Sequence, residues 1–171
     1  MDLSKLAPSD AEVALRGLER RYRGLFAGLG EDESPDDLAH RAHGGWSAIE
    51  HIVAAAWGIA AADRALERVL TVDDPVLPAA DVDPEARPKP GAPTGTVHER
   101  LSELGLEANA AADRIASVPA SDWSRTATVE GTGRTVTALD LARLAVDVGV
   151  THLRAAEDVL AAVRGRPVDP S

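Results

Sequence analysis

The chain has no cysteine, which excludes disulfides, thiolate nucleophiles and cysteine metal ligands. Any thiol chemistry would need a thiol supplied from outside the protein. Aromatic residues are also scarce, because one Phe, one Tyr and three Trp accompany a hydrophobic content of 44%. The core must therefore be built largely from Ala, Leu and Val, which suits closely packed helices and disfavours an all-β fold.

Positive charge and long apolar runs are also in short supply. The 18 basic residues face 28 acidic ones, and the formal net charge of −10 would repel a phosphate backbone. No segment approaches the ~20 apolar residues that span a bilayer, and the N-terminus lacks a basic stretch followed by an apolar core. We therefore expect no nucleic-acid partner, no membrane partner and a cytoplasmic location.

Four segments carry the periodicity of amphipathic helices within a length of 171 residues, 1–171, that fits one domain. Each segment opens with a capping box, in which a hydroxyl and an acid three residues later satisfy N–H groups of the first turn. The four boxes are Ser9 with Glu12, Ser47 with Glu50, Thr96 with Glu99 and Thr137 with Asp140. They predict an all-α four-helix bundle with helices at about 9–29, 47–70, 96–117 and 137–164.

Two connections between these helices have distinct compositions. Residues 71–95 contain six prolines, which remove backbone donors and fix φ too often for a helix or a central strand. This long loop either covers a site or only carries the chain back along the bundle. Residues 125–136 alternate Thr and Val around glycines, which predicts a small hairpin before the last helix.

Histidines are the best candidates for chemistry, because neutral imidazole shuttles protons near neutral pH and binds divalent metals. His51 on the second helix and His152 on the inner stripe of the fourth can meet across the core of a bundle. A catalytic zinc site generally uses three protein ligands. The third would come from Glu50, Asp63, Asp147 or the loop histidines His40 and His43. The alternative is a buried histidine with satisfied nitrogens and no ion.

One face of the second helix carries small residues, which either let another helix approach closely or leave room for a ligand. An acid, Asp63, interrupts the neighbouring apolar seam, where it either pairs with an Arg or faces water. The expected ligand-binding residues are Ala54, Trp57, Gly58, Asp63 and Val148.

Two stretches resemble the DinB-like superfamily, which includes mycothiol-dependent maleylpyruvate isomerases and bacillithiol or mycothiol transferases. Residues 44–52, Gly-Gly-Trp-Ser-Ala-Ile-Glu-His-Ile, are similar to the Trp-Ser-x-x-Glu opening of that family's second helix. Residues 135–154 resemble its final helix, which usually carries His-x-x-x-His. The resemblance implies a DinB-like four-helix bundle over nearly the whole chain.

The resemblance also implies a divalent metal, Zn or Ni, held by three histidines. The first would lie eight residues after the Trp, where this chain has Ala54. The other two fall on Val148 and His152, or on Asp147 and Thr151 if the register shifts by one residue. The set is incomplete, and His51, His152 and Asp147 are the donors that remain to hold a metal.

Two functions follow from these residues. The first is a thiol-dependent, mycothiol-type transferase or isomerase for a small electrophile, with His152 as ligand or base and His51 and Glu50 assisting. The second is a metal-free small-molecule-binding or dimerisation module that has lost the metal site. The cofactors are accordingly a divalent metal with a low-molecular-weight thiol, or none. A homodimer is carried over from the resemblance.

Overall fold

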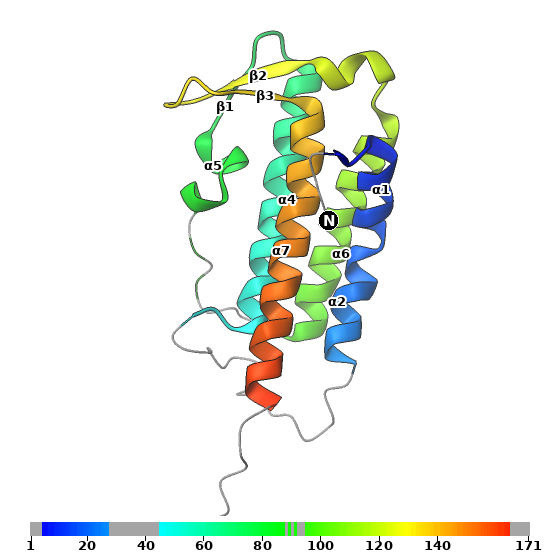
Figure 1. Ribbon diagram of the computed structural model, residues 1–171, viewed down its shortest axis with the longest axis vertical. Helices are drawn as coiled ribbons and strands as arrows, with labels where there is room; N and C mark the ends of the chain where they lie inside the picture. Colours follow the sequence, from blue (N-terminus) through cyan, green and yellow to red (C-terminus); the bar gives the residue numbers. More distant parts are fainter. Residues whose placement is uncertain (1–4, 28–44, 88, 90, 92–94, 165–171) are drawn as a thin grey trace, which may run out of the picture.

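The computed structural model describes residues 5–27, 45–87, 89, 91 and 95–164, and shows a four-helix bundle with a small sheet across one end (Figure 1). The sequence predicts this all-α fold, and the structure confirms it. The helices are α1 (Pro8–Arg16), α2 (Leu18–Phe26), α4 (Ala48–Thr71), α5 (Ala79–Val82), α6 (Val97–Ser117) and α7 (Ala138–Arg164). The other elements are the 3₁₀ turns η3 (Pro84–Ala86) and η4 (Ala120–Ser124) and the strands β1 (Val76–Leu77), β2 (Thr126–Val129) and β3 (Thr135–Thr137).

Helices α4 and α7 form the most extensive interface of the bundle, and α6 and the α1–α2 pair complete it. α4 and α7 run in opposite directions, whereas α4 and α6 run in the same direction (Figure 1). Two consecutive parallel helices require the chain to return along the bundle between them. β1, α5 and η3 lie on this return path beside α4, so the Pro-rich loop does carry the chain back.

Three of the four predicted capping boxes are confirmed. Ser47 N–H donates to Glu50 at 2.6 Å, and Glu50 N–H donates to the Ser47 hydroxyl at 3.2 Å. The same reciprocal bonds join Thr96 with Glu99, at 2.7 and 3.2 Å, and Thr137 with Asp140, at 2.9 and 3.1 Å. Helices α4, α6 and α7 therefore begin where their local sequence satisfies the first-turn donors.

The predicted start of the first helix at Ser9 is wrong. The helix begins at Pro8, and the N–H of Ala7 donates to Asp10 at 3.3 Å. Proline is favoured at the first helical position, because its φ is already helical and an N–H at that position would have no acceptor within the helix. The predicted continuous helix is also divided at Gly17 into α1 and α2, where glycine lowers helix propensity.

The predicted hairpin is confirmed as strands β2 and β3, which pair antiparallel with Thr126 opposite Thr137. Their turn contains Gly131 and Gly133 at φ values of +76° and +65°, a region that favours glycine. A third strand, β1, pairs parallel with β2 and joins the return loop to the hairpin. The sequence did not predict β1, because two residues between prolines carry no strand pattern.

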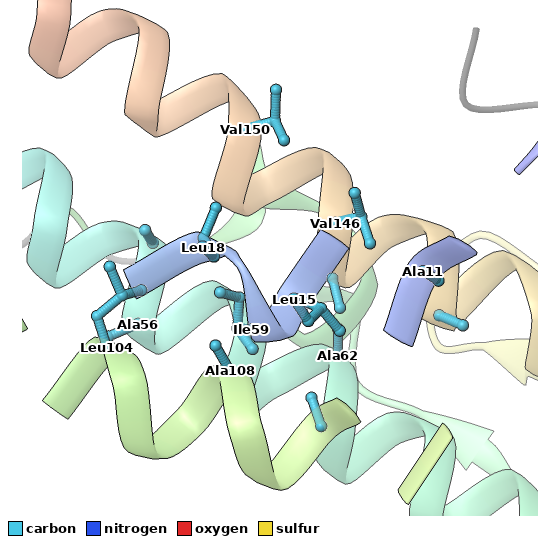
Figure 2. Close-up of a cluster of buried hydrophobic side chains, with 14 of the residues drawn as sticks. Ala11, Leu15, Leu18, Ala56, Ile59, Ala62, Leu104, Ala108, Val146 and Val150 are labelled. Atoms are coloured by element: carbon cyan, nitrogen blue, oxygen red, sulfur yellow. The ribbon is translucent and has the colours of Figure 1, made fainter. Parts of the chain in front are cut away.

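The core is continuous through the bundle, and its side chains come from α1, α2, α4, α6 and α7 (Figure 2). The only tyrosine, Tyr22, is fully buried, and its hydroxyl donates to the backbone carbonyl of Gly149 on α7 at 2.9 Å. Burial raises the pKa of Tyr22, so this hydroxyl keeps its proton. Within the described residues, no helix combines the length and apolar character that crossing a membrane requires.

Two leucines on α6 provide a matched test of this core. Leu104 is fully buried, whereas Leu106 is 72% exposed. We expect Leu104→Ala to lower the free energy of unfolding by about 2–5 kcal/mol, because it removes buried apolar contacts and leaves a cavity. Leu106→Ala should change it by no more than about 0.5 kcal/mol. Urea unfolding measures both, and equal losses would contradict this packing of α6.

Candidate functional site

A pocket of ≈ 580 Å³ opens beside α4, with walls from α7, α6 and the return loop. This volume falls within the range that holds small-molecule ligands. Ala54 and Ala61 give α4 a wall of small side chains, which leaves the space open. The lining residues are Trp46, Ala54, Trp57, Ala60, Ala61, Arg64, Ala80, Asp81, Pro84, Glu85, Arg87, Lys89, Glu107 and His152.

Three aromatic rings meet at the pocket. The Nδ1 atoms of His51 and His152 lie 3.1 Å apart, although the two residues are on different helices. The indole of Trp46 stacks on His152, with ring centroids 5.6 Å apart and planes inclined by 12°. Trp46 also contacts His51, at a centroid distance of 5.4 Å. The capping box of Ser47 fixes the start of α4, so it also positions Trp46 and His51 on either side of that start.

Both histidines of this pair are held in the neutral form. Burial lowers the pKa of His51, and the neighbouring Glu50 charge opposes that shift in part. Burial lowers the pKa of His152 to about 4, with further lowering from the charges of His51 and Arg87. In a neutral pair at hydrogen-bond distance, one Nδ1 carries the hydrogen and the other accepts it. The pair can therefore accept a proton or bind a cation, but it carries no charge near neutral pH.

Arg87 brings the return loop onto α4. Its Nε donates to the carbonyl of Ala80 at 2.8 Å and its Nη2 to the carbonyl of Asp81 at 3.1 Å. A Cβ on Gly58 would lie 2.6 Å from Nη1 of Arg87 and would collide with Val148. Glycine is therefore required at position 58 for the guanidinium and α7 to lie against this part of α4. Of the predicted binding residues, Ala54 and Trp57 line the pocket, whereas Gly58 and Val148 pack against each other and do not line it.

The remaining predicted acids lie away from the histidine pair. Both carboxylate oxygens of Asp63 are bound by Arg114, at 2.6 and 3.0 Å, so Asp63 takes part in an ion pair and does not line the pocket. Asp147 is exposed on α7, where it accepts a hydrogen bond from Thr151 at 3.5 Å. Glu50 is buried in the capping box of α4. The expected ligand set of His51, His152 and Asp147 is therefore not assembled.

The three-histidine metal site does not fit the residues present. Two of its positions hold Ala54 and Val148, which have no donor atom, and only His152 remains. No group of three or more His, Cys, Asp or Glu side chains that could hold a metal occurs in the part of the chain that the structure describes. His40 and His43 lie outside the described residues, and His98 is exposed beside Arg23.

The sequence did not predict the roles of two residues of the site. Trp46 opens the Trp-Ser-x-x-Glu stretch, but its stacking on His152 depends on the approach of α7 to α4. Arg87 is one basic residue in a Pro-rich loop, and only the path of that loop brings it over Gly58. The loop was expected either to cover a site or only to return the chain, and six of its residues line the pocket.

Comparison with solved structures shows that this fold belongs to a known class of four-helix bundle. A particular structure of this class is YfiT from Bacillus subtilis, described as a probable metal-dependent hydrolase with an unusual four-helix bundle topology. It matches with a TM-score of 0.75 over 95% of this chain and 90% of its own, at 15% sequence identity. No protein-family model matches the chain, and no curated protein matches it significantly. The likeness to YfiT therefore establishes the fold alone.

The lowered pKa of His152 predicts a pH dependence of stability. As pH falls from about 6.5 towards 4, the unfolded chain binds a proton that the folded chain resists, so the folded state loses stability. Between pH 7 and pH 5 this effect removes at most about 2 kcal/mol. We expect His152→Gln to lose less stability over this interval than the wild type in urea unfolding. The exposed His98→Gln should behave like the wild type, and equal losses in all three proteins would contradict a neutral His152.

Proposed function

We propose that this protein binds a small, largely apolar molecule in the pocket beside α4, without the three-histidine metal site. The observation that carries this proposal is the pocket itself, ≈ 580 Å³ in volume and walled by two tryptophans and small side chains. Most of the wall area is apolar, although seven of the fourteen lining residues, including His152 and Arg87, have ionisable side chains. Small-molecule sites commonly have this composition, in which apolar walls provide affinity and polar groups fix orientation.

The pocket can be closed by one substitution on α4. We expect a thermal-shift screen of small aromatic and aliphatic compounds to find some that raise the Tm of the wild type, because ligand bound only to the folded state stabilises it. Ala54→Phe should abolish this response by filling the pocket, whereas Ala161→Phe, at an exposed position of α7, should retain it. The proposal fails if no compound raises Tm or if Ala54→Phe responds like the wild type.

A metal-dependent hydrolase, the description given to YfiT, is the second candidate. One observation favours it: the Nδ1 atoms of His51 and His152 converge to 3.1 Å, and neutral imidazole is the form that binds divalent metals. Two ligands are one fewer than a catalytic zinc site generally uses. The metal-free proposal is therefore preferred for the described residues.

Elemental analysis separates the two candidates. We expect wild-type protein, purified without a histidine tag and incubated with Zn²⁺, Ni²⁺ or Mn²⁺, to retain well below one metal ion per chain. His51→Ala and His152→Ala should give the same low content. Near-stoichiometric metal in the wild type, lost in both variants, would support the hydrolase instead and direct work to hydrolysis assays.

The thiol-dependent transfer or isomerisation implied by the DinB-like resemblance stays a proposal for the same pocket. His152 faces this pocket and can accept a proton, but a pKa of about 4 makes it a weak base towards a thiol, whose own pKa is usually about 8.5. Any such activity would have to lower the pKa of the thiol when it binds. A homodimer likewise stays a proposal, for which solution mass measurement is the test.

A further inference from the structure

Arg87 presents a positive charge to the pocket without a carboxylate partner. Among the described residues it forms no salt bridge, and its two hydrogen bonds go to backbone carbonyls of its own loop. Asp81, a nearby acid, pairs with Arg64 at 3.5 Å. Arg87 is half-buried, and this burial lowers its pKa. A half-buried guanidinium of this kind is stabilised when an anion binds to it.

The geometry leaves one nitrogen of Arg87 available for that anion. Nε and Nη2 are occupied by the carbonyls of Ala80 and Asp81, which hold the plane of the guanidinium in place. Nη1 lies over Gly58, at the site where any larger residue would place its Cβ. It makes no hydrogen bond within the described residues. Because a guanidinium is always charged and rigid, the fixed Nη1 provides a pre-organised donor with low entropic cost of binding.

The surrounding charges limit the charge of the ligand. Three basic residues, Arg64, Arg87 and Lys89, and three acidic residues, Asp81, Glu85 and Glu107, line the pocket. The lining is balanced, and the whole chain has a formal net charge of −10. This balance disfavours a dianion such as a phosphate monoester, and is compatible with one negative charge placed next to Arg87.

The walls next to Arg87 favour a flat, apolar body. Trp46 and Trp57 contribute large aromatic faces, and the alanines of α4 leave space beside them. Trp57 is 51% exposed, which is unusual for a side chain of this size and leaves its ring available to a ligand. Aromatic rings prefer offset-stacked or edge-to-face contacts with other aromatic groups, which a planar ligand can supply.

We propose, building on the pocket function above, that the ligand is an aromatic monocarboxylate whose carboxylate accepts a hydrogen bond from Nη1 of Arg87. Its ring lies against the wall to which Trp46 and Trp57 contribute. The proposal assigns Arg87 as the residue that selects the charge of the ligand. If Arg87 did not have this role, the pocket would bind apolar molecules regardless of their charge.

Calorimetric titration with three matched probes tests the selectivity of the wild type: 3-phenylpropionate, its uncharged amide 3-phenylpropionamide, and phenyl phosphate. The carboxylate should bind roughly 10- to 100-fold more tightly than the amide, the factor that a charge-assisted hydrogen bond contributes. Phenyl phosphate should bind more weakly than the carboxylate. Equal binding of acid and amide would overturn the role of Arg87 and leave the pocket function standing. Failure of both to bind would overturn the aromatic monocarboxylate, while the thermal-shift screen still decides the pocket function, and preference for the phosphate would also overturn the monocarboxylate.

Two arginine variants test whether Arg87 causes the preference for the carboxylate over the amide. Arg87→Met should lower the affinity for 3-phenylpropionate far more than the affinity for the amide, so that the preference for the acid disappears. Arg134→Met, at an exposed position in the β2–β3 turn, should keep the wild-type preference. If Arg87→Met does not fold, as judged by thermal melting, Arg87→Lys replaces it and should lose part of the preference. A folded variant at position 87 with the full wild-type preference would contradict the assignment.

Discussion

Close packing of α4 against α7 is the constraint on which the site depends. The two helices approach through small residues, and on each helix a glycine occupies a point of contact. At Gly58 of α4 a Cβ would collide with Val148 of α7, and at Gly149 of α7 a Cβ would lie 3.4 Å from Ile59 of α4. This approach brings His51 and His152 to hydrogen-bond distance and shields both in part from water, which lowers their pKa values and favours the neutral form near neutral pH.

The parallel direction of α4 and α6 explains why the return loop contributes to the site. It forces the chain to return along the outside of the bundle, where α5 of the return path packs against α4 (Figure 1). The expectation that the prolines of this path exclude helix is wrong, because the short helix α5 and the 3₁₀ turn η3 fit among them, and β1 attaches the start of the path to the hairpin. Arg87 thereby comes to rest over Gly58, where it completes a pocket that the four helices alone would leave open.

Local chemistry explains which features were predictable from the sequence. The capping boxes at Ser47, Thr96 and Thr137 involve residues three apart, so they mark helix starts without knowledge of the fold. The prediction at Ser9 failed because Pro8 was the stronger local signal. Helical periodicity placed His152 on an inner stripe, from which it could meet His51, but the stacking of Trp46 and the place of Arg87 depend on tertiary contacts. No short motif contains that information.

The central claim is that the pocket beside a neutral histidine pair binds a small molecule without a metal. The most direct test is a crystal structure of protein soaked with 3-phenylpropionate and Zn²⁺, with anomalous data collected at the zinc absorption edge. We predict density for the acid against Arg87 and no anomalous peak beside the Nδ1 atoms of His51 and His152. A strong anomalous peak between these two imidazoles, with no acid in the pocket, would contradict the account and establish a metal centre.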